Sequence, residues 1–162
     1  MPTTLTPYLT FGGNTRHAYA FYEKALGGKI ESMMSFADMP PMPAVSMTAA
    51  PTAAASSAAG CADGPPPSGD GIMHACLSLP SGAMLFAGDA PPGMPFDGMK
   101  GVMLALQYDS VDEARTVFHA LSQGGTVTMP LAPAFWSTIF GMVTDRFGVS
   151  WAVNGEPIDF NS

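Results

Sequence analysis

Two stretches of the chain place apolar residues three or four positions apart, which is the spacing of one face of an α-helix. The first stretch has Ala18, Phe21, Tyr22 and Ala25 on this face. The second stretch lies 96 residues later and repeats the pattern with Ala114, Val117, Phe118 and Leu121. The pattern predicts two amphipathic helices at corresponding places in two halves of the chain.

Both predicted helices have typical start and stop signals. Asn14 and Ser110 are expected to act as N-caps, because their side chains can accept a hydrogen bond from a free amide of the first turn. Glu113 follows Ser110 at the spacing of a capping box. Glycine pairs at 27–28 and 124–125 follow the apolar faces, as is common at helix C-termini. These signals bound the two helices at both ends.

Runs of apolar residues between turn signals predict strands around the helices. In each half, one run precedes the helix, one follows it, and two more form a hairpin around a turn that contains glycine, at 81–82 or 147–148. The predicted strands are residues 5–11, 29–36, 72–79 and 83–87 in the first half, and residues 102–108, 125–129, 138–145 and 149–153 in the second.

The order of these elements predicts a duplicated fold. Each half is a β-α-β-β-β unit, and the units are expected at residues 1–92 and 93–162 of one domain. The helix of a unit covers only one face of its sheet. Two units can hide further apolar surface by curling their sheets together. We therefore expect an α+β fold in which two tandem units form a curled, half-open mixed sheet with a concave cleft.

Segment 40–71 interrupts only the first unit. Of its 32 residues, 26 are Ala, Pro, Gly, Ser or Thr, and they follow no helical or strand period. The two helices are 96 residues apart in the sequence, whereas the two hairpins are 66 residues apart. The difference of 30 residues is close to the length of this segment. Two interpretations remain open for this predicted loop: an inert insertion, or a lid over a pocket.

Composition limits the classes of partner. Apolar residues make up 47% of the chain, which is enough for a packed core, and the formal net charge is −7. This charge argues against binding to nucleic acid or to an anionic membrane surface. Two cysteines, Cys61 and Cys76, form neither a disulfide scaffold nor a zinc cluster. The first ten residues lack the pattern of a signal peptide, and we expect a cytoplasmic protein.

Several short segments follow one another in an order typical of a known family. They are Leu5-Thr6-Pro7-Tyr8-Leu9 with Phe11 and Asn14, Ala18 with Phe21-Tyr22 and Leu26-Gly27-Gly28, Phe36 with Met39-Pro40, Met73-His74-Ala75, Gly88-Asp89-Ala90, Phe135-Trp136, Phe140-Gly141, and Val143-Thr144-Asp145 with Phe147-Gly148 and Trp151. With the duplication, the chain resembles the vicinal oxygen chelate superfamily, which includes glyoxalase I, extradiol dioxygenases and bleomycin-resistance proteins. Within it, the chain is most similar to the PhnB-like group, also labelled 3-demethylubiquinone methyltransferase-like. The resemblance implies a glyoxalase-like fold.

The metal enzymes of this superfamily take their ligands, usually His and Glu, from the first and last strand of each unit. The resemblance and the duplication both select Pro7 and Phe86 in the first unit, and Met103 and Ala152 in the second. None of these side chains offers the nitrogen or oxygen donors that a hard divalent cation needs. A shift of one residue in the first strand brings in Tyr8, which is a rare ligand. We therefore expect no metal and no cofactor.

Two residues are candidates for catalysis without a metal. His74 lies on a hairpin strand and is either a hydrogen-bonded core residue or a neutral base in the pocket. Asp89 is either a turn or cap carboxylate or a partner that orients His74 or the substrate. His17 and His119 lie on the predicted helices, away from the cleft. No nucleophile or oxyanion pattern accompanies His74 and Asp89, so enzyme activity stays open.

The expected ligand pocket is apolar and aromatic. The chain has 13 methionines, which are adaptable side chains that fill a core or line a soft-walled pocket. Trp151 is expected in the core. The residues expected to line the pocket are Tyr8, His74, Phe86, Met103 and Trp136.

These features favour a binding function. We expect a PhnB-like protein of the glyoxalase and bleomycin-resistance type, without the usual metal ligands, that binds a small apolar or aromatic molecule in the sheet cleft. One alternative is a metal-dependent lyase, isomerase or dioxygenase of the same superfamily that acts on a small oxygenated substrate. A third is an oligomeric scaffold without a ligand. The resemblance implies a homodimer, and the low share of charged residues, 12%, leaves apolar surface for its interface.

Overall fold

The computed structural model of the 162-residue chain describes residues 3–38, 70–91 and 94–158. Of the Ala/Pro-rich segment 40–71, only Asp70 and Gly71 fall in these ranges. Both interpretations of that segment therefore lie outside the described residues.

The first unit is a four-stranded mixed sheet with one α-helix. Its strands lie in the order β1-β4-β3-β2, with β1 parallel to β4 and the other neighbours antiparallel. Its elements are β1 (Tyr8–Phe11), α1 (Thr15–Ala25), β2 (Lys29–Ser35), the 3-10 helix η1 (Phe36–Asp38), β3 (Ile72–Ser78) and β4 (Met84–Asp89).

The second unit repeats this topology. Its strands lie in the order β5-β8-β7-β6, again with the first strand parallel to the last. Its elements are β5 (Leu104–Gln107), α2 (Val111–Ser122), β6 (Thr126–Ala134), β7 (Ser137–Thr144) and β8 (Ser150–Asn154). The β-α-β-β-β order predicted for both halves is confirmed.

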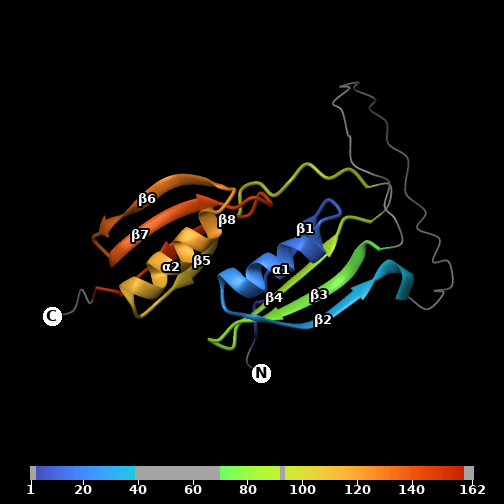
Figure 1. The fold of residues 1–162 in the computed structure, drawn as a ribbon, viewed down its shortest axis with the longest axis horizontal. Coiled ribbons are helices and arrows are strands. Elements are labelled where there is room, and N and C mark those ends of the chain that lie inside the picture. The colour runs from blue at the N-terminus through green and yellow to red at the C-terminus, as the bar shows by residue number, and fades with distance from the viewer. Residues whose placement is uncertain (1–2, 39–69, 92–93, 159–162) are drawn as a thin grey trace, which may run out of the picture.

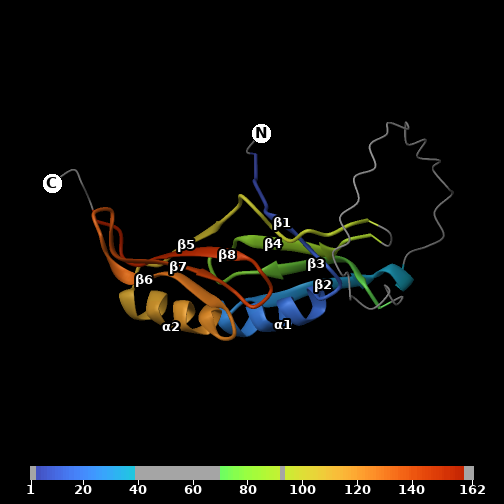
Figure 2. The ribbon, with the colours of Figure 1, turned by 90° about the horizontal axis from the view of Figure 1, so that it is seen from above.

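The two sheets lie side by side, with α1 and α2 on the same side of the layer that they form (Figures 1 and 2). Among the described strands, no ladder joins one sheet to the other, so the sheet is not closed. The predicted α+β, glyoxalase-like fold is confirmed, with its mixed sheet divided into two hydrogen-bonded parts.

The helices form where the apolar pattern predicts them. Ala18, Tyr22 and Ala25 of α1 are buried, as are all four predicted core residues of α2. The helices and the inner faces of both sheets share one hydrophobic cluster. Burial of these apolar faces is the main force that holds each helix on its sheet.

The N-cap prediction holds for one helix only. The Ser110 side chain accepts a hydrogen bond from the Glu113 amide, with an oxygen–nitrogen distance of 3.4 Å. The Asn14 side chain makes no such bond to α1. Instead, Asp89 at the end of β4 accepts a hydrogen bond from the Thr15 amide at 3.0 Å. Asp89 therefore caps α1 from the neighbouring strand, which no local sequence signal reveals.

Three strand predictions differ from the structure by three residues or more in length. Strand β1 begins at Tyr8 rather than at residue 5, β5 spans Leu104–Gln107 rather than 102–108, and β6 continues to Ala134 rather than ending at 129. The β6–β7 pairing contains several register shifts, which let the strand pass Pro130 and Pro133. Proline cannot donate a hydrogen bond to a ladder and is tolerated on an edge strand such as β6. These prolines interrupt the strand pattern in the sequence, so the prediction ended too early.

Asp145 connects the two units. It is 3% exposed and follows β7 in the second unit. Its Oδ2 accepts hydrogen bonds from the Tyr22 hydroxyl of α1 at 2.6 Å and from the Trp151 indole at 2.8 Å. Its Oδ1 accepts hydrogen bonds from the amides of Phe147 and Val149 at 2.8 and 3.1 Å. The Asp-x-Phe-Gly-x-x-Trp run of the sequence therefore shapes this turn and fastens it to the first unit.

An aromatic cluster surrounds this contact. The Phe147 ring packs against three rings of the first unit, with centroid distances of 6.5, 5.7 and 6.1 Å to Phe11, Phe21 and Tyr22. Trp151 packs edge-on against Tyr22 at 5.4 Å. We call these five residues the aromatic clamp. Such pairs add to the free energy of burying the rings, so the clamp stabilises the junction between the units.

We expect the protein to lose stability at alkaline pH. Burial raises the pKa of the Tyr19 and Tyr22 hydroxyls above the ordinary value of 10.0. The folded state therefore keeps both protonated where the unfolded chain has begun to ionise. The stabilisation is complete below about pH 10 and falls above it by about 1.4 kcal/mol per pH unit for each tyrosine.

Urea unfolding at increasing pH measures this loss. Tyr22→Phe is expected to make the free energy of unfolding fall less steeply with pH. Tyr8→Phe, at a half-exposed position, is expected to leave most of this pH dependence unchanged. A free energy of unfolding that stays flat above about pH 10 is inconsistent with this account.

Candidate functional site

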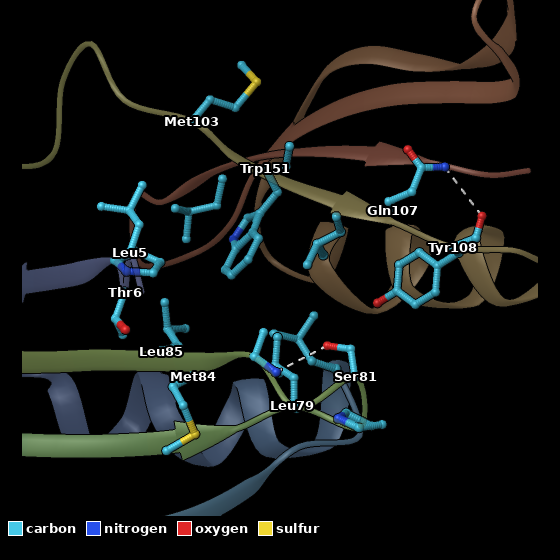
Figure 3. Close-up of a pocket in the computed structure, with 18 of the residues that line it drawn as sticks. Leu5, Thr6, Leu79, Ser81, Met84, Leu85, Met103, Gln107, Tyr108 and Trp151 are labelled. Carbon is cyan, nitrogen blue, oxygen red and sulfur yellow. Dashed lines mark hydrogen bonds between the residues drawn. The ribbon is translucent and has the colours of Figure 1, made fainter. Parts of the chain in front are cut away.

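A pocket of about 880 Å³ lies at the junction of the two units, and we call it the junction pocket. Its walls come from the chain before β1, the β3–β4 hairpin, strand β5 and the start of α2 (Figure 3). It is lined by Thr4, Leu5, Thr6, Pro7, Leu26, Leu79, Pro80, Ser81, Gly82, Ala83, Met84, Leu85, Met103, Leu104, Ala105, Leu106, Gln107, Tyr108, Asp109, Glu113 and Trp151.

The junction pocket has an apolar part and a polar part. In Figure 3, Trp151 lies between Leu5 on one side and Tyr108 on the other. Leucine, methionine and proline residues also line the apolar part. The residues at the end of β5 and the start of α2 add an amide, a phenol and two carboxylates, from Gln107, Tyr108, Asp109 and Glu113. An apolar pocket with a few polar groups at one end is the usual form of a small-molecule site.

Tyr8, His74 and Phe86 were predicted to line the pocket, and the structure places them together elsewhere. The His74 ring lies 5.8 Å from the Tyr8 ring and 5.2 Å from the Phe86 ring, centroid to centroid. Tyr8 alternates along β1 with Leu9, which is buried in the core beneath α1. These three rings therefore lie on the face of the first sheet turned away from the helices, which we call the open face.

Met103 and Trp136, the other two predicted pocket residues, lie in different places. Met103 lines the junction pocket. Trp136 lies between β6 and β7, where its indole donates a hydrogen bond to the Asn154 side chain at 3.1 Å and its ring packs against Phe140 at 5.2 Å. The predicted set is thus divided among the open face, the junction pocket and the tip of the second sheet.

Asp89, the second catalytic candidate, makes four hydrogen bonds within the fold. Its Oδ1 accepts from the Gly13 amide, the Thr15 amide and the Thr15 hydroxyl at 3.0, 3.0 and 2.7 Å. Its Oδ2 accepts from the Ile72 amide at 2.7 Å. Within the described ranges, none of its hydrogen bonds goes to His74. This arrangement matches the expectation of a cap carboxylate, and it places Asp89 on the helix side of the first sheet.

The resemblance implies metal-ligand positions at one corner of each unit, on its first and last strands, and the strand pairing gives the register of these positions. Tyr8 pairs with Phe86 in the first unit, and Ala105 pairs with Ala152 in the second. Tyr8 rather than the expected Pro7 therefore stands opposite Phe86, and Ala105 rather than the expected Met103 stands opposite Ala152. The offset between β1 and β5 is 97 residues, one more than the offset of the helices. The Tyr8 hydroxyl donates its hydrogen to the Met73 carbonyl at 3.1 Å.

This set of side chains does not fit a divalent cation. Phenyl and methyl groups offer no lone pair, and a protonated phenol is a poor ligand. Across residues 3–38, 70–91 and 94–158, no group of three or more His, Cys, Asp or Glu side chains is placed to hold a metal ion.

Cys76 does not have the surroundings of a reactive thiol. It is buried on β3, where burial and the negative charge of Glu31 both raise its pKa. A raised pKa reduces the fraction of thiolate, which is the nucleophilic form.

Comparison with known proteins identifies the family. Residues 4–153 match the family described as Glyoxalase/Bleomycin resistance protein/Dioxygenase superfamily. The chain belongs to this superfamily. Among its curated relatives is "Protein YjdN" of Escherichia coli (strain K12), which is 31% identical over 150 residues that span 93% of each chain.

Solved structures of similar proteins share the fold. Protein PA1353 from Pseudomonas aeruginosa is 40% identical, with a TM-score of 0.75 over 96% of this chain and 98% of that one. A Bacillus cereus structure titled as a putative 3-demethylubiquinone-9 3-methyltransferase, PhnB protein, is 23% identical, with a TM-score of 0.67 over 94% of this chain and 99% of that one. The predicted resemblance to the superfamily, with PhnB-like proteins among its neighbours, is confirmed.

The two α-helices are short amphipathic segments that pack on the sheets. Within the described part of this superfamily member, no helix is both long enough and apolar enough to cross a bilayer.

The sequence predictions did not include most of the junction pocket, and they left out Trp151, Tyr108, Asp109 and Glu113 as lining residues. One signal could have found it. In the duplication, Ser81 corresponds to Phe147 and Leu85 corresponds to Trp151. At both positions the first unit has a much smaller side chain than the second. A small residue in one unit where the other has a large one predicts a space at the junction.

Proposed function

We propose that this superfamily member binds a small apolar or aromatic molecule in the junction pocket, without a metal ion. One observation carries the proposal: a space of about 880 Å³ lies between the units and is lined mainly by apolar side chains. Its size falls in the ordinary range for small-molecule pockets. The alternative of a metal-dependent enzyme is less favoured, because Tyr8, Phe86, Ala105 and Ala152 occupy the corners where ligands are needed.

Trp151 supports the proposal and offers a means to test it. Its side chain is 1% exposed in the core and its ring borders the junction pocket. The chain has two tryptophans, so Trp136→Phe leaves Trp151 as the sole indole. A bound aromatic molecule is expected to lie near this indole and to receive its excitation energy.

The test is a titration of the Trp136→Phe protein with N-phenyl-1-naphthylamine, a neutral probe that accepts excitation energy from tryptophan. We expect saturable quenching of Trp151 emission, together with enhanced emission from the probe. Ser81→Phe is expected to abolish both signals. A phenyl ring at this turn would fill the junction pocket in the way that Phe147 fills the corresponding space of the aromatic clamp. Ala105→Trp, read from the probe's emission, is a second variant that narrows the same pocket.

Ser32→Phe is the matched control. Ser32 is exposed on β2 and does not line the junction pocket, so this variant is expected to bind the probe as the parent does. A probe signal that survives both Ser81→Phe and Ala105→Trp but is lost in His74→Ala contradicts the proposal and places the site on the open face.

We further propose that the protein is a cytoplasmic homodimer that pairs through the face turned away from the helices. Exposed apolar side chains of the two sheets support the dimer, and they include Tyr8 and Met34 in the first unit and Met129 in the second. Light scattering is expected to give twice the mass of the 162-residue chain, and Met34→Lys with Met129→Lys is expected to give a monomer. A folded parent protein that stays monomeric at all concentrations contradicts this proposal.

A further inference from the structure

The junction pocket lies where the duplication would place a second aromatic clamp. Residues 79, 80, 81 and 85 of the first unit correspond to residues 145, 146, 147 and 151 of the second. Tyr108, just after β5, corresponds to Phe11 at the end of β1. All five of these counterparts line the pocket. The pocket is therefore the open equivalent of a contact that is filled on the other side of the molecule.

Differences in residue size explain why one contact is filled and the other is open. In the filled contact, the turn of the second unit inserts Arg146 and Phe147 against the first unit. The Arg146 guanidinium lies 5.2 Å from the centre of the Phe21 ring, and Phe147 completes the clamp. The corresponding turn carries Pro80 and Ser81, which are too small to reach across. The missing volume is that of an aromatic ring with a cation beside it.

The charges around the junction pocket favour a cation. Among the described residues, Asp109 and Glu113 are the two charged ones that line it, and no lysine or arginine does. Glu113 lies in the first turn of α2. The partial positive charge of a helix N-terminus is about half an elementary charge, so these carboxylates outweigh it. The negative charge of Glu113 also acts at Tyr108, whose pKa is raised first by burial and further by Glu113.

We propose that the junction pocket selects small aromatic cations, an inference that rests on the binding function proposed above. The aromatic ring of the ligand lies against Trp151 and Leu85, in the space that corresponds to the one filled by Phe147 in the aromatic clamp. The ammonium or guanidinium group points toward Asp109 and Glu113. Aromatic anions are disfavoured, because the described lining residues include no cationic side chain to neutralise them.

The test uses three molecules that share one ring and differ in charge. Each displaces bound N-phenyl-1-naphthylamine from the Trp136→Phe protein, and the three are 1-naphthylmethylammonium, 1-naphthalenemethanol and 1-naphthoate. We expect the cation to bind more tightly than the anion by on the order of tenfold, with the neutral alcohol in between. Added sodium chloride is expected to weaken the cation's advantage, since these carboxylates lie near the surface.

Charge-neutral variants assign the selectivity to named residues. The double variant Asp109→Asn, Glu113→Gln is expected to remove most of the cation's advantage while leaving the affinity for 1-naphthalenemethanol unchanged. Asp112→Asn is the matched control, because Asp112 lies in the same helical turn but does not line the pocket. This control is expected to keep the preference for the cation.

The outcomes separate this inference from the function on which it rests. If 1-naphthoate binds as tightly as 1-naphthylmethylammonium while the alcohol still displaces the probe, the selectivity is overturned and the binding function stands. If the double variant keeps the full preference for the cation, Asp109 and Glu113 are not its source and the inference is wrong. If the probe itself does not bind, both the function and the inference fail.

Discussion

An Asp145→Ala variant is expected to lose about 3–5 kcal/mol of unfolding free energy, because a buried carboxylate with four hydrogen-bond donors is removed. The substitution leaves the Tyr22 hydroxyl, the Trp151 indole and two turn amides without the acceptor that they share. Three of these four donors belong to the second unit and the fourth to the first. The loss therefore weakens both the turn and the junction.

Urea unfolding followed by circular dichroism measures this effect. Asp97→Ala, at an exposed position, is the control and is expected to change the free energy by less than about 0.5 kcal/mol. Asp145→Asn is expected to lie between the two, because an amide keeps one acceptor oxygen but no charge. An Asp145→Ala protein as stable as the Asp97→Ala protein would show that the units are held together by other contacts.

An Asp89→Ala variant is expected to lose about 2–4 kcal/mol, for a related reason. Its carboxylate caps α1 through Thr15 and also holds the amide of Ile72 at the start of β3. The residue is a positioning group for these elements and lies outside the junction pocket. Probe affinity, measured well below the unfolding transition, is therefore expected to stay within about twofold of the parent.

This result separates a cap from a catalytic or ligand-binding role. Thr15→Val removes the hydroxyl that donates a hydrogen bond to Asp89. This variant is expected to lose less unfolding free energy than Asp89→Ala. If Asp89→Ala keeps its stability but loses probe binding, Asp89 belongs to the site and the assignment as a cap is wrong.

The helices and strands could be predicted because their signals are local. The spacing of Ala114, Val117, Phe118 and Leu121 matches one face of a helix, and burial of this face on the sheet stabilises the same segment. The local signal was wrong at Asn14, whose side chain does not cap α1. Asn14, which precedes α1 in the sequence, was the expected cap, but the pairing of β1 with β4 brings Asp89 to the amide of Thr15. A tertiary contact had replaced a local one.

The candidate site could not be predicted in the same way, because it is made by contacts between the units. Leu5, Ser81 and Met103 line one pocket although they come from three distant parts of the chain. The predicted residues Tyr8, His74 and Phe86 do come together, as expected for neighbouring strands, but on the open face. Alternation along a strand indicates which residues share a face, and it does not show where two sheets leave a space.

The central claim is that the two units leave a ligand site at their junction. The most direct test is a crystal structure of the protein with a bromine-labelled 1-naphthylmethylammonium, located by the anomalous scattering of bromine. The account predicts a bromine peak within the junction pocket, beside Trp151 and Leu85. A peak beside His74 and Phe86 on the open face, with the junction pocket empty of the probe, would contradict it.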